Sequence, residues 1–241
     1  MTSSRGLVAP TLSGALLGSL VAALFVGLTL AGAAWGHDIS ASNARFVEGI
    51  EGPAIGPFLY LGAKHMVTGL DHVFFLIGVV FYLFRLRDVV TYVSLFTLGH
   101  SLTLIGGVLA GGGANAYIVD AIIGFSVVYK AFENMGGFKS VLKLSFDPRI
   151  AVFAFGLAHG LGLATKLTNL TVSEDGLLVN LLSFNVGVEL GQVLVLAVVV
   201  TFLNVWRSHR SFERHAFLAN ALLMTGGFIL AIQQIVGYVT S

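Results

Sequence analysis

The stretch GAKHMVTGLDHVFFLIG, residues 62–78, carries two histidines and an aspartate into an otherwise apolar run. A membrane-spanning helix needs about 20 predominantly apolar residues. An ionisable group inside such a span costs roughly 3 kcal/mol and marks a functional site by default. Asp71 and His72 are therefore candidates for function. Lys64 can extend its amine to the membrane interface, and His65 is either an interfacial residue or part of the same site.

Composition identifies an integral membrane protein, with the lipid bilayer as its first partner. Of 241 residues, 56% are hydrophobic and 10% are charged, against about 25% charged in soluble domains. The net charge of +1 provides no basic field for nucleic acid. The chain has no cysteine, so imidazole, carboxylate and amide groups are the available metal ligands. No Gly-rich phosphate loop ending in Gly-Lys-Ser/Thr occurs in the sequence, so ATP use is not expected.

Residues 1–36 resemble a secretory signal peptide, with Arg5, a long apolar core and small residues before His37. An uncleaved extra N-terminal helix is the alternative, because the apolar core exceeds the usual length of about 7–15 residues. Cleavage after Gly36 would leave His37 at the N-terminus, where its amine and imidazole together can chelate a metal. Cleavage after Ala33 would not form that site.

Six further apolar segments predict an all-α fold, a polytopic transmembrane bundle forming a single domain over residues 37–241. Residues 53–63 either extend the first span or lie at the interface. Basic residues gather in 85–88, 139–149 and 207–214, which places these loops in the cytoplasm and both mature termini outside a bacterial inner membrane. The expected spans are near residues 66–84, 89–110, 115–135, 149–166, 177–205 and 215–238.

On a continuous helix, His65 and His72 would share one face. Residues seven apart return to within about 20° of each other and stand about 10.5 Å apart. Asp71 would lie about 100° around the axis from His72, where it can face a neighbouring helix or orient an imidazole.

Each of the first five predicted spans carries ionisable residues. Polar side chains often contribute one interhelical hydrogen bond of about 0.6 kcal/mol, and that role suffices for Asn185. It does not explain several titratable groups near mid-membrane. Imidazoles and carboxylates without sulfur suit Ni²⁺, Co²⁺, Zn²⁺ or Cu²⁺, and imidazole also relays protons near neutral pH. The predicted metal ligands are His65, Asp71, His72, His100, His159 and Glu189.

Five motifs in order resemble the HupE/UreJ membrane proteins, which are associated with hydrogenase and urease maturation. This resemblance covers residues 55–238 and implies a nickel, sometimes cobalt, permease with about six spans after a cleavable leader. The motifs are HMVTGLDH (65–72), FTLGHSLTL (96–104), SVVYKAFEN (126–134), FGLAHGLG (155–162) and FNVGVELGQ (184–192).

The match is uneven within the motifs. The first family motif falls on His65, Asp71 and His72, with Met66 where the best-known nickel permeases have proline. His159 lies in a matching Ala-His-Gly.

In the second family motif, two ligand positions differ. Phe155 stands where the family pattern has a further histidine, and Gly162 stands where it has a glutamate. The chain thus resembles a divergent branch of the family, in which Glu189 substitutes as a carboxylate.

We therefore expect a permease, not an enzyme, that moves a divalent metal, nickel first, toward the cytoplasm for metalloenzyme maturation partners. It would hold no permanent cofactor. His65 and the acidic residues Asp38, Glu48 and Glu51 would form the outer mouth. The predicted proton path or second shell consists of Asp120, Glu133 and Asn185.

Two alternatives stay open at the level of sequence. One is a non-transporting accessory or assembly subunit, in which the polar residues fix helix packing. The other is an intramembrane metalloenzyme or redox subunit with a permanent metal, although the sequence shows no nucleophile with a base and an orienting group. The oligomeric state is open as well.

Overall fold

The computed structural model describes residues 47–112, 114–168 and 174–241, whose regular structure is entirely helical. The all-α prediction is confirmed. The predicted leader, with His37 and Asp38, lies outside the described residues. The helices are α3 (Ile55–Thr68), α4 (Leu70–Val80), α5 (Leu86–Leu109), α6 (Ala116–Asn134), α7 (Gly137–Ser140), α8 (Pro148–Thr168), α9 (Leu177–Arg207) and α10 (Ser211–Thr240).

The six predicted spans correspond in order to α3 with α4, then α5, α6, α8, α9 and α10. By length and composition, α5, α8, α9 and α10 can cross a membrane, and the bent pair α3 and α4 makes a fifth span if counted as one. The remaining helix, α6, has 19 residues and includes Asp120, Lys130 and Glu133, which lower its apolar character.

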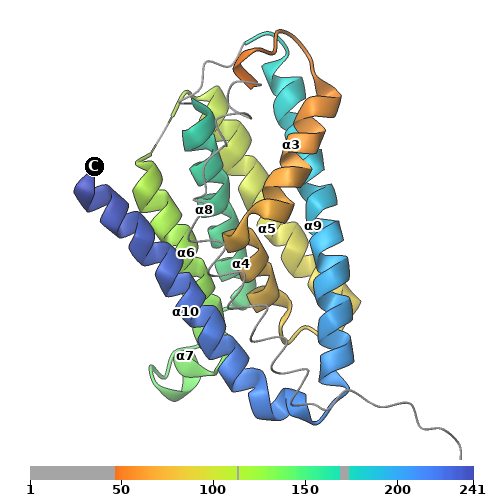
Figure 1. Ribbon diagram of the computed structural model, residues 1–241, viewed down its shortest axis with the longest axis vertical. Coiled ribbons are helices and arrows are strands. Elements are labelled where there is room, and N and C mark those ends of the chain that lie inside the picture. Colours follow the sequence, from red (N-terminus) through yellow and green to blue (C-terminus); the bar gives the residue numbers. More distant parts are fainter. Residues whose placement is uncertain (1–46, 113, 169–173) are drawn as a thin grey trace, which may run out of the picture.

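Three pairs of long helices enclose the short helix α4 (Figure 1). The helices α5 and α8 lie side by side, as do α3 and α9, and α6 and α10. α4 packs among these pairs, and eight of its 11 residues are buried. Residues at the start of α4 therefore lie inside the bundle, although α4 is one of the shortest of the described helices.

The prediction of one continuous first span over 66–84 was wrong. The helix begins at Ile55 and stops at Thr68, Gly69 is extended (φ −73°, ψ 101°), and α4 sets off at 65° to α3. Residues 55–63 belong to α3, the first helix of this bent pair. A side chain at Gly69 would come within 3.0 Å of both the His65 carbonyl oxygen and His72 Nδ1, so glycine is required at this close approach.

The loops with most of the basic residues lie together at one end of the bundle, called here the basic end and drawn at the bottom of Figure 1. The opposite end, where α3 begins, is called the α3 end. Arg207 donates hydrogen bonds to the carbonyl oxygens of Phe81 (2.6 Å) and Leu83 (3.1 Å), and so fastens the end of α4 to α9. The gathering of basic loops at one end is the arrangement that the positive-inside rule requires.

Close contact between α3 and α9 depends on glycine. A methyl group at Gly62 would collide with the carbonyl oxygen of Phe184. Small residues permit this approach between membrane helices, where packing replaces the hydrophobic effect as the main attraction.

We predict that Gly62→Ala lowers stability by about 1–3 kcal/mol through overpacking, measured as a lower midpoint of thermal unfolding in detergent. Gly56→Ala, on the same helix, is the matched control, because a methyl group there has nothing within 4 Å. Equal midpoints for the two variants would contradict this view of the α3 and α9 interface.

Candidate metal centre

Four histidines and an aspartate from four helices meet where α4 begins. His72 is the central residue: its ring centroid lies 4.7 Å from that of His159, 4.8 Å from His65 and 6.1 Å from His100. The predicted 10.5 Å between His65 and His72 was wrong, because the break at Gly69 folds the two rings toward each other.

The potential ligand atoms form two overlapping sets of three, with atoms in each set no more than 4.8 Å apart. The first set is His65, His72 and His100, and the second is Asp71, His72 and His159. His72 belongs to both. The centre therefore offers either three imidazoles or two imidazoles and a carboxylate, a donor set without sulfur that suits divalent first-row transition metals.

This centre is deeply buried. Asp71 is 3% exposed, His72 and His159 are 1% exposed, and His100 is fully buried, whereas His65 is only partly buried. Because burial of unpaired polar groups is costly, the four buried side chains of the centre need polar partners. The side chain of His100 has a hydrogen-bond contact with that of Asn185, and its ring lies among the other imidazoles of the centre.

Asp71 fixes the ring of His72. Asp71 Oδ1 accepts hydrogen bonds from the His72 backbone N–H (2.7 Å) and from the ring at Nδ1 (2.9 Å). A carboxylate only accepts, so Nδ1 carries the proton and Nε2 carries the lone pair that a metal needs. The sequence had offered two roles for Asp71, and its contact with His72 matches the orienting one.

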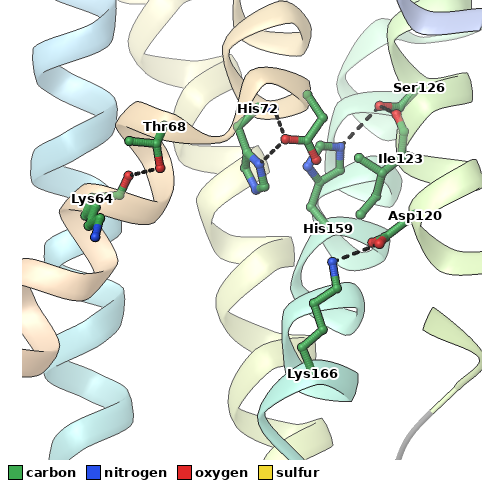
Figure 2. A network of polar contacts seen from close by, with 9 residues as sticks. Lys64, Thr68, His72, Asp120, Ile123, Ser126, His159 and Lys166 are labelled. Atoms are coloured by element: carbon green, nitrogen blue, oxygen red, sulfur yellow. Dashed lines mark hydrogen bonds and ion pairs between the residues drawn. The ribbon is translucent and has the colours of Figure 1, made fainter. Parts of the chain in front are cut away.

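Ser126 fixes the ring of His159, as Figure 2 shows. The Ser126 hydroxyl donates its one proton to the Ile123 carbonyl oxygen at 2.6 Å. It must therefore accept from His159 Nε2, which lies 3.2 Å away. With the proton on Nε2, the lone pair of the neutral imidazole is on Nδ1.

The other predicted residues lie outside this centre. Asp120 forms an ion pair with Lys166 at 2.8 Å (Figure 2), and Glu133 forms one with Lys130 at 2.6 Å. Asn185 belongs to neither ligand set, but its side chain has a hydrogen-bond contact with His100 and accepts a hydrogen bond from Ser101 at 2.9 Å.

Among the predicted ligands, Glu189 alone is not brought to the centre. Its side chain is exposed on α9, and neither set of ligand atoms includes it. Glu48 and Glu51 are also exposed and lie just before α3.

Sequence reasoning missed two residues that support this region. Ser126 and Lys166 carry no signal alone, since each is a common partner for a neighbouring helix. Spacing gives a partial signal: Lys166 is seven residues after His159 on α8, so the two share a face.

We predict that Ser126→Ala weakens Co²⁺ binding to the purified protein about 10-fold, because the loss of an orienting partner typically costs 10–100-fold in metal affinity. Calorimetric titration measures this affinity. Ser183→Ala is the matched control: Ser183 is also buried, but its hydroxyl donates to the Val179 carbonyl within its own helix. Unchanged affinity in Ser126→Ala would show that this hydroxyl does not set the tautomer.

Comparison with known proteins places this chain in a family. Residues 41–241 match the family described as HupE / UreJ protein. Among curated proteins and solved structures, none matches the chain. The match covers all the described helices and every residue of the metal centre. The chain therefore belongs to the HupE/UreJ family, a family of membrane transporters and accessory proteins associated with metal handling.

Proposed function

We propose that this protein is a membrane permease for a divalent transition metal, with nickel as the first expected cargo and cobalt as the second, and that it serves metalloenzyme maturation. The observation that carries the proposal is the convergence of His65, Asp71, His72, His100 and His159, from four helices, on one buried point.

Packing alone does not account for this convergence. A polar residue that only joins two helices needs one hydrogen bond. Thr97 and Gln192 illustrate that role, with a single bond of 2.8 Å between α5 and α9. In contrast, His100 is fully buried with its ring 6.1 Å from that of His72, in a cluster of several imidazoles and not in one pairwise contact.

The two overlapping ligand sets favour a carrier over a permanent metal site. A transport site must bind its ion well enough to accept it and weakly enough to release it. An ion held by His65, His72 and His100 can exchange two ligands for Asp71 and His159 while it keeps His72, provided that Asp71 gives up its hydrogen bond to His72 Nδ1 when it binds the ion. Ligand exchange of this kind provides a stepwise path, in which no step leaves the ion without protein ligands.

The direction follows from charge and exposure. The basic loops favour the cytoplasm for the basic end, so the α3 end would face outward. His65, the one partly exposed ligand, would receive the ion, helped by the acidic residues before α3. Glu133 and Asp120 remain the proposed carriers of a coupled proton. Each is already paired with a lysine, which a proton would release.

We predict that His72→Gln lowers Ni²⁺ uptake into proteoliposomes at least about 10-fold, because both ligand sets lose their shared member. A Ni²⁺-quenched dye inside the vesicles measures uptake. His209→Gln is the control, since His209 is exposed at the basic end and should transport at the wild-type rate.

Other outcomes point to the other classes. Equal uptake in His72→Gln and the wild type would favour an accessory subunit in which the histidines only pack. Stoichiometric metal that survives purification, without flux, would favour a permanent metal centre.

A further inference from the structure

An aromatic layer lies against the metal centre on the side of the basic end. Four helices contribute a polar residue to the centre or a polar partner that supports it. On each of these helices, an aromatic residue lies three or four positions nearer the basic end, which is one helical turn or about 4.5–6 Å away. The pairs are His72 and Phe75 on α4, His100 and Phe96 on α5, Ser126 and Tyr129 on α6, and His159 and Phe155 on α8.

The four rings form a continuous set. The centroid of Phe75 lies 5.2 Å from that of Phe96 and 5.8 Å from that of Phe155, and Phe155 lies 5.1 Å from Tyr129. These separations are within the range of direct aromatic contact. The layer therefore bridges α4, α5, α6 and α8 across the interior of the bundle.

The layer also touches the histidines directly. The ring of His159 lies 5.0 Å from that of Phe96 and 5.4 Å from that of Phe75. His72 lies 6.3 Å from Phe96. Phe75 is 0% exposed and Phe96 is 1% exposed. The centre is therefore lined by apolar side chains on this side.

Polar groups return beyond the layer. One turn further toward the basic end, α6 carries Glu133, paired with Lys130, and α5 carries Tyr92. The apolar layer thus separates a polar centre from a polar zone near the basic loops. A hydrophobic constriction between two polar zones stops ions, because an ion would lose its water there without gaining ligands.

We propose that Phe75, Phe96, Phe155 and Tyr129 are the gate that closes the metal centre toward the basic end, and that the cargo leaves when Phe155 and Tyr129 swing aside. The inference rests on the proposed function, since a gate has a purpose only if the ion leaves on this side. Phe155 and Tyr129 are the moving members because they are partly buried, whereas Phe75 and Phe96 are packed on all sides.

The test uses the absence of cysteine in this chain, which makes one introduced thiol a clean reporter. Ser126→Cys places a thiol on the centre side of the layer. In metal-free proteoliposomes of known orientation, a charged, membrane-impermeant thiol reagent is added from the basic side. We expect slow labelling of Ser126→Cys alone, and labelling at least about 10-fold faster when Phe155→Ala is added, because the constriction is then open.

Phe184→Ala in the Ser126→Cys background is the matched control. Phe184 also touches the cluster, with its ring 5.9 Å from that of His65, but it belongs to α9 and lies outside the layer. It should leave labelling from the basic side slow. Phe155→Ala alone should still bind Co²⁺, which shows that the centre is folded.

Two results would overturn the gate: rapid labelling of Ser126→Cys from the basic side with the layer intact, or no acceleration when Phe155→Ala is added, although Phe155→Ala alone still binds Co²⁺. Metal flux is measured separately. If the thiol pattern appears but the wild type moves no metal, the gate stands as a barrier and the proposed permease function fails.

Discussion

The break between α3 and α4 is the constraint on which the centre depends. Asp71 is in the first turn of α4, where the N-terminal dipole of the helix favours a carboxylate, and its Oδ1 accepts from both the backbone and the ring of His72. Without the extended conformation at Gly69, His65 and His72 would stand about two turns apart on one helix. The break brings their rings into contact at 4.8 Å.

Glycine brings the other two histidines into range. Gly156 packs against the carbonyl oxygen of Phe96, and Gly160 packs against that of His100, so α5 and α8 approach with backbone against backbone. An imidazole reaches only a few ångströms from the backbone of its own helix. His100 and His159 therefore meet His72 only because no side chains hold α5 and α8 apart, which links the many glycines of this chain to the centre.

Much of this structure can be predicted from residues, and the missing part has a physical cause. The lengths of the apolar runs predict the bounds of α5, α8, α9 and α10 to within a few residues, because a spanning helix satisfies its own backbone hydrogen bonds. The break at Gly69 is not visible in the same way, since a single glycine inside an apolar run is compatible with a continuous helix. The effect of this glycine on the helix is seen only in the structure, where the positions of the neighbouring side chains, Asp71 and His72, are known.

The exposure of Glu189 shows the same limit. A helix such as α9 has a polar strip of Asn185, Glu189 and Gln192 in its sequence, and the strip predicts one inward face. In the structure Asn185 and Gln192 are buried and bonded to α5 through Ser101 and Thr97, whereas Glu189 is turned outward. Residues four apart are offset by about 40° around a helix, enough to separate a buried position from an exposed one at the edge of a strip.

The number of carboxylates in the centre determines how firmly it can hold a divalent ion. Four neutral imidazoles supply lone pairs but no charge, and Asp71 is the one anionic member of the two ligand sets. A bound divalent cation would therefore keep a net charge of about +1 in a buried site, where low dielectric makes uncompensated charge costly. A second carboxylate would neutralise the ion and favour retention. A centre with a single carboxylate therefore fits the proposed carrier, which must release its ion, better than it fits a permanent metal site.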